Sequence, residues 1–195
     1  MNLCNELKKK FADALEIEND GYRLYSKNKK HRYYFYKSIQ NITNGEKATV
    51  IMINPSEKNP HPENGTPDNT IDNLYKIIVQ IAFSNECQDD LKISSFEVIN
   101  LYSDIDSKPE EIIKKNAEKL NESILEYVIK KSKIIIPAWG VENKFNADTT
   151  KLLTKIKKWS KNKKVFVVIN KYPCHFTTQC TSITRNPKFI PYNFN

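Results

Sequence analysis

Apolar residues recur at every fourth position near the start of the chain, at Leu3, Leu7, Phe11 and Leu15. Residues with this spacing lie along one face of an α-helix. The pattern therefore predicts a helix over residues 2–16.

Two short aromatic segments follow, over residues 22–26 and 32–37, and a polar turn lies between them. Strand-forming residues on both sides of a polar turn predict a β-hairpin. We interpret this hairpin as a sheet edge or a lid over the core.

From residue 48 onward, segments rich in strand-forming residues alternate with amphipathic segments. The first kind predicts four strands, over residues 48–53, 93–101, 133–139 and 164–169. The amphipathic segments predict helices over residues 70–83, 108–130 (one helix or two) and 146–159. Residues 54–69 are a predicted long loop, and residues 171–195 a predicted irregular tail.

Strands that alternate with helices are joined by right-handed crossovers, which makes the sheet parallel. The predicted fold class is α/β: a three-layer α/β/α sandwich on a short, mainly parallel four-stranded sheet, with an N-terminal helix and hairpin added. We expect one domain over residues 1–195. Residues 1–47 form its helix and hairpin, and residues 48–195 its core and basic C-terminal part.

The composition excludes several classes of protein. Apolar residues make up 39% of 195 residues, which suffices for one sizeable core. The longest apolar run is far shorter than a membrane-spanning helix, and the N-terminus lacks the apolar stretch of a secretory signal, so we expect a cytoplasmic protein with no membrane partner. Only four glycines occur, none close to another, which excludes a Walker A loop and a G-x-G-x-x-G fingerprint. The four cysteines fit no metal pattern, and we expect neither a metal nor a cofactor.

The positive charge of the chain is concentrated at its C-terminal end. Residues 1–150 carry 21 basic and 23 acidic side chains, whereas residues 151–195 carry ten basic side chains and no acidic one. Such a segment is either a solvated face or a surface that contacts phosphates. The candidates for contacts with phosphate or DNA are Lys155, Lys157, Lys158, Lys171, Asn186 and Lys188.

Amides, hydroxyls and aromatic rings follow the predicted strands. Asn54-Pro55-Ser56 follows the first strand, Asn100 ends the second with Tyr102 just beyond, and Trp139-Gly140 ends the third. Ligands of parallel α/β sheets bind beyond the carboxyl ends of the strands, so we expect the pocket there. Side chains of these kinds suit the recognition of a nucleobase by hydrogen bonds and stacking.

Met52-Ile53-Asn54-Pro55-Ser56 resembles the G-I-N-P-G motif of the mismatch-specific uracil/thymine DNA glycosylases, and Asn186-Pro187 resembles the start of their second motif. Asn100 and Ala138-Trp139-Gly140 resemble strand-end residues of uracil-DNA glycosylases. A closer resemblance is to an uncharacterised bacterial and phage family, domain of unknown function 1643. Its pattern matches here at Met52 to Ser56, Asp68-Asn69-Thr70, Ile99-Asn100-Leu101 and Ala138 to Gly140.

The resemblance implies a DNA glycosylase-like protein that flips a damaged or modified nucleotide and cleaves its N-glycosidic bond. It places Asn54 where a water would be held for attack. Asn100 would bind the base edge, and Tyr102 or Trp139 would line the pocket. Pro55, Asp68 and Gly140 complete the candidate base or nucleotide site, and Ser56 with residues 186–188 would hold phosphate.

Alternatives remain open for several of these residues. Asn54 is equally explained by a turn before Pro55, Asp68 by a helix N-cap, and Trp139 by a place in the core or the pocket wall. At the level of function, the alternative is a non-catalytic binder of a nucleotide or its derivative, in a phage or host-defence setting. A protein-interaction role of the basic face is a third hypothesis. The partner is thus DNA or a free nucleotide, and the oligomeric state is undetermined.

Overall fold

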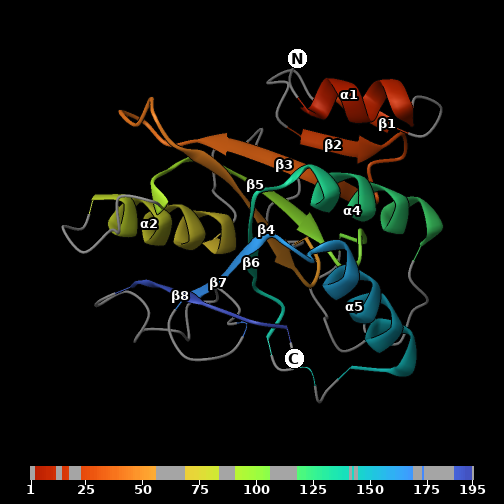
Figure 1. The fold of residues 1–195 in the computed structure, drawn as a ribbon. Helices are drawn as coiled ribbons and strands as arrows, with labels where there is room; N and C mark the ends of the chain where they lie inside the picture. Colours follow the sequence, from red (N-terminus) through yellow and green to blue (C-terminus); the bar gives the residue numbers. More distant parts are fainter. Residues whose placement is uncertain are drawn as a thin grey trace.

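A computed structural model of the chain describes residues 3–11, 15–17, 23–55, 69–83, 91–105, 118–140, 142, 145–168, 173 and 187–194. Its helices are α1 (Leu3–Lys10), α2 (Asn69–Phe83), α4 (Lys119–Lys131) and α5 (Ala147–Trp159). Its strands are β1 (Leu15–Ile17), β2 (Arg23–Ser26), β3 (Arg32–Ser38), β4 (Glu46–Met52), β5 (Ile93–Asn100), β6 (Ile134–Pro137), β7 (Lys164–Val168) and β8 (Phe189–Pro191). The fold is therefore of the α/β class (Figure 1).

The strands form one mixed sheet in the order β1-β2-β3-β5-β4-β6-β7-β8. Its centre is parallel, because β4 pairs in parallel with both β5 and β6, and β6 with β7. Antiparallel strands flank this centre: β3 pairs with β5 on one side, and β8 with β7 on the other.

The side chains of the central strands divide the core into two layers. On β4, Val50 and Met52 pack with α2, whereas Ile51 packs with α1, α4 and α5. This alternation is what a strand buried on both faces requires. Figure 1 shows the same division, with α2 on one side of the sheet and α1, α4 and α5 on the other.

Three details differ from the sequence-based expectation. The sheet is wider than four strands, because the predicted hairpin, β2 and β3, joins it through β5. The first helix ends at Lys10, and Leu15 instead begins β1, where its backbone pairs with Ser26. The predicted irregular tail contributes β8. None of the described helices is long and apolar enough to cross a membrane.

Candidate functional site

The connections of the parallel strands diverge between β4 and β6. The chain leaves β4 through α2 and enters β5 on one side, and it leaves β6 through α5 and enters β7 on the other. The two helices cover opposite faces of the sheet. Ligands of open α/β sheets bind at such a point, outside the carboxyl ends of the strands. We refer to this side of the sheet as the carboxyl edge.

Backbone hydrogen bonds bring the strand ends together at the carboxyl edge. The Leu101 amide donates to the Met52 carbonyl oxygen, the Tyr102 amide to that of Ile53, and the Ala138 amide to that of Ile51, each at 2.8 Å. These bonds continue the parallel pairing just beyond β4, β5 and β6. Six of the predicted site residues therefore lie at one edge of the sheet: Asn54, Pro55, Asn100, Tyr102, Trp139 and Gly140.

The six residues do not all serve one face of that edge. Asn100 follows Phe96 and Val98 in the strand alternation and so belongs to the α2 face. Tyr102 and Trp139 instead pack in the core beneath α4 and α5. A ligand that contacts all three must therefore reach over the ends of the strands.

Tyr102 has a clear structural task. Its hydroxyl bonds the hydroxyl of Thr149 in the first turn of α5, where the Asn146 side chain accepts from the Thr149 amide at 2.8 Å. Burial raises the pKa of the Tyr102 phenol, so the group stays neutral near pH 7. Tyr102 thereby fixes the start of α5 next to the carboxyl edge.

Asn100 is a buried polar side chain at this edge. The residue is 1% exposed, and its Oδ1 atom has no hydrogen-bond partner in the described part of the chain. Its main-chain oxygen is satisfied, since the Asn121 amide of α4 donates to it at 3.0 Å. A buried acceptor without a partner is costly, and a ligand that donates a hydrogen bond would satisfy it.

Asn54 makes a local bond: its Nδ2 atom donates to the Pro55 carbonyl oxygen at 3.0 Å. A side-chain bond to the neighbouring backbone is what the turn interpretation of Asn54 expects. Gly140 has a positive φ of 83°, which a side chain would strain, and so it shapes the turn after Trp139. Ser56, Asp68, Lys171 and Asn186 lie outside the described residues.

A polar cluster that no sequence pattern indicated lies beside the end of β5 and is formed by His31, Tyr33, Ser103, Asp104 and Glu118. The Glu118 carboxylate accepts from the Tyr33 hydroxyl at 3.0 Å and from the Ser103 hydroxyl at 2.8 Å. His31 Nδ1 lies 3.2 Å from the Ser103 hydroxyl and 3.8–3.9 Å from the two carboxylates. Because one ring nitrogen faces all three groups, the arrangement is not that of a Ser-His-acid triad, in which both ring nitrogens are used.

The polar cluster serves as a structural junction. Burial raises the pKa of the Tyr33 phenol, and the adjacent Glu118 carboxylate raises it further, so Tyr33 remains a neutral donor. The cluster joins the start of β3, the segment after β5 and the residue before α4. Within the described ranges, no group of three or more His, Cys, Asp or Glu side chains is placed to hold a metal.

Two of the predicted DNA-contacting lysines of α5 are partnered by acidic side chains. Lys155 lies 2.6 Å from Glu122 of α4, and Lys157 lies 3.3 Å from Glu142. Lys158 and Lys188 are exposed. Residues 151–195 contain no acidic residue, but in the folded protein carboxylates from earlier segments lie beside these lysines.

Replacing Lys155, Lys157 and Lys158 by glutamine tests the α5 face. If this face contacts DNA, the plot of log affinity against log salt should flatten by about 2–3 units, one for each lost phosphate contact. Fluorescence anisotropy with a labelled duplex and a labelled single strand measures the slope. An unchanged slope would assign these lysines to a solvated helix face.

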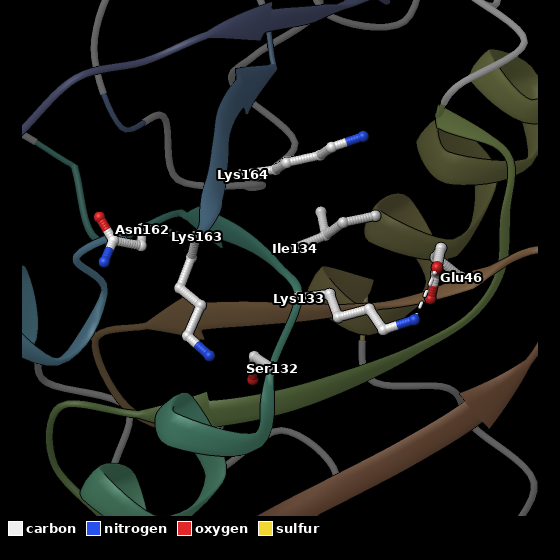
Figure 2. A pocket seen from close by; sticks show the side chains of 7 residues that line it. All are labelled: Glu46, Ser132, Lys133, Ile134, Asn162, Lys163 and Lys164. Atoms are coloured by element: carbon white, nitrogen blue, oxygen red, sulfur yellow. Dashed lines mark hydrogen bonds and ion pairs between the residues drawn. The ribbon is translucent and has the colours of Figure 1, made fainter.

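A pocket of about 330 Å³ lies at the opposite edge of the sheet (Figure 2). Its lining comes from the first residues of β4, β6 and β7 and the segments before β6 and β7: Glu46, Ser132, Lys133, Ile134, Asn162, Lys163 and Lys164. We refer to it as the amino-edge pocket. This pocket lies at the opposite end of the strands from the carboxyl edge, where the sequence predicted a pocket, and the strand-end rule did not predict it.

The described residues form an α/β protein whose strand connections diverge between β4 and β6. Residues 32–176, more than half of the chain, match the family described as "Protein of unknown function (DUF1643)", and the chain belongs to this family. No curated protein and no solved structure matches the chain. None of these comparisons supports the resemblance to the uracil-DNA glycosylases.

Proposed function

We propose that this protein binds a nucleobase at the carboxyl edge and acts as a DNA glycosylase-like enzyme on a damaged or modified base. The observation that carries the proposal is the buried Oδ1 atom of Asn100, an acceptor without a partner among the described residues. Ring N–H and exocyclic amino groups of bases donate hydrogen bonds of the kind this atom lacks.

In the proposed reaction, the Asn54 side chain orients a water molecule toward C1′ of the flipped nucleotide. The water oxygen bonds to C1′ while the N-glycosidic bond breaks, and the base leaves with the bonding electrons. The water proton passes to solvent, because an amide cannot accept it, and the departing base is protonated in turn. Without a general base the reaction would be slow.

A second candidate is a binder of free nucleotides that uses the same edge without catalysis. The ion pairs of Lys155 with Glu122 and of Lys157 with Glu142 favour this candidate. They lower the positive potential of the α5 face, on which contact with a long polyanion would depend.

Asn100→Leu tests the role of Asn100 in binding. The change removes an acceptor that is unsatisfied without ligand, so the free energy of unfolding should be unchanged or higher. Affinity for the preferred base should fall at least about tenfold, the effect of about 1.4 kcal/mol from one lost hydrogen bond. Calorimetry with deoxyuridine, thymidine, deoxycytidine, 5-methyldeoxycytidine, deoxyadenosine and deoxyguanosine measures it.

The control is Asn5→Leu on the exposed side of α1, which should bind like the wild type. Wild-type protein that binds none of the six nucleosides at millimolar concentration would refute the proposal. So would an Asn100→Leu variant that retains both affinity and selectivity.

A further inference from the structure

We propose that the amino-edge pocket is a binding site for a phosphate-bearing anion, separate from the carboxyl edge. Three lysines and one glutamate supply its charged groups, so the lining carries a net charge of about +2 near pH 7. The proposal stands on this pocket and does not depend on the proposed function.

Two of the lysines face the same side of the sheet. Lys164 pairs with Ile134 in the β6–β7 register, and Ile134 packs on the α2 face. Lys133 extends to the Glu46 carboxylate at 2.9 Å, and Figure 2 shows both ammonium groups beside Ile134. The two ammonium groups therefore flank Ile134 on one face of the sheet, and an anion seated over Ile134 would meet both.

The existing contacts of these two lysines are easily exchanged. The side chains of Lys133 and Glu46 are 74% and 46% exposed, and an ion pair so open to water contributes little to stability. Lys164 is exposed, and no acidic side chain pairs with it among the described residues. An incoming dianion would thus gain two cations and displace one weak pair.

Lys163 has a different task, although it lines the same pocket. Its ammonium group donates to the Lys130 carbonyl oxygen at 2.8 Å, near the end of α4. A cation at this place offsets the negative end of the helix dipole. Lys163 is therefore assigned to the helix end, and Lys133 and Lys164 to the anion.

The volume of the pocket limits the size of its ligand. Asn162, which has a positive φ of 68° in the tight turn between α5 and β7, also lines the pocket, but Figure 2 shows its side chain on the side of β7 away from Lys164. A volume of about 330 Å³ accommodates a phosphate or a diphosphate and leaves room for water. A phosphate group carries more negative charge than a single carboxylate, which favours it where two ammonium groups lie on one face.

The amino-edge pocket is too far from Asn54 for one nucleotide to reach both. The seven residues of β4 separate the two edges, which corresponds to about 20 Å along the strand. The anion is thus a separate phosphate compound, or the backbone of a nucleic acid several nucleotides away from the base that is read.

The test compares Lys133→Gln/Lys164→Gln with the charge-matched control Lys8→Gln/Lys9→Gln on the exposed side of α1. The probes are pyrophosphate, measured by calorimetry, and a labelled 20-nucleotide oligothymidylate, measured by anisotropy between 50 and 200 mM salt. For the first variant we expect about tenfold weaker binding at the lower salt concentration. The salt slope for the oligonucleotide should be smaller by about 2. The control should bind like the wild type.

Binding of pyrophosphate supports a free phosphate compound as ligand, and binding of the oligonucleotide alone supports a nucleic-acid backbone. Failure of both probes to bind wild-type protein overturns the inference, as does an equal loss in both double variants. Deoxyuridine, which carries no phosphate, should bind the Lys133→Gln/Lys164→Gln variant as it binds the wild type. The failure of the carboxyl-edge proposal is thereby distinguished from the failure of this one.

Discussion

Replacing Glu97 by alanine should lower the free energy of unfolding by about 2–4 kcal/mol. Glu97 lies on β5, and its side chain is fully buried. Its carboxylate accepts two hydrogen bonds and forms one ion pair. The Tyr34 hydroxyl of β3 donates at 2.8 Å, the Thr49 hydroxyl of β4 donates at 2.6 Å, and the Lys47 ammonium group lies at 2.6 Å. One carboxylate thus joins three neighbouring strands.

The loss of stability arises mainly because the hydroxyl donors of Glu97 stay buried without an acceptor. Burial raises the pKa of the Tyr34 phenol, and so does the adjacent carboxylate, so Tyr34 is a neutral donor that would remain buried without an acceptor. Thr49 is equally buried, whereas the Lys47 side chain is 32% exposed and can turn toward water. We therefore expect the penalty to come from Tyr34 and Thr49 more than from the lost ion pair.

Urea unfolding followed by circular dichroism measures the effect. Tyr34→Phe and Thr49→Val are the matched single changes, and each should cost about 1 kcal/mol. Adding Tyr34→Phe and Thr49→Val to Glu97→Leu should recover part of the loss, because no buried donor is then stranded. A loss below about 0.5 kcal/mol for Glu97→Ala would contradict the assigned role.

Asn54→Ala should lower the rate of base release by about 10²–10³, the usual cost of removing one positioning group from a reaction centre. The position supports a selective effect, since Asn54 follows β4 at the carboxyl edge and lies outside both core clusters. The fold should therefore remain intact, and the thermal midpoint should change by only a few degrees.

The assay follows free base released from DNA that carries uracil, thymine mismatches or modified cytosines, with alkali cleavage at the abasic site. Asn41→Ala, in the exposed turn after β3, is the control and should release base at the wild-type rate. If the wild type releases no base from any substrate but binds a nucleoside, the binder hypothesis replaces the enzyme hypothesis. Equal rates for Asn54→Ala and wild type would remove Asn54 from the reaction.

The sequence predicted the centre of the fold because local periodicity and burial agree there. Residues 50–53 and 134–136 are continuous apolar runs, and they mark the central parallel strands β4 and β6. The outer strands gave a weaker signal. β8 has only three residues and ends in Pro191, a residue that strands tolerate at edges. Leu15 continues the helical spacing of the first helix, although its backbone pairs with β2.

The predicted site residues of the carboxyl edge lie at one end of the sheet because each is at or just beyond the carboxyl end of a parallel strand. Contacts between residues that are distant in the sequence could not be predicted from local patterns. His31 and Ser103 are 72 positions apart, and no spacing rule connects them. The acid partners of the α5 lysines were missed for the same reason, since Glu122 lies 33 positions before Lys155.

The insertion of β5 between β3 and β4 has a consequence for the order of events during synthesis. Tyr34 meets its partner Glu97 only 63 positions later in the chain, which corresponds to roughly 3–12 s on the ribosome. Until β5 emerges, β3 and β4 each present an unpaired edge, because both take β5 as a neighbour. Open strand edges attract other chains, so the nascent protein is most exposed to aggregation in that interval, and chaperones that cover strand edges should act on it then.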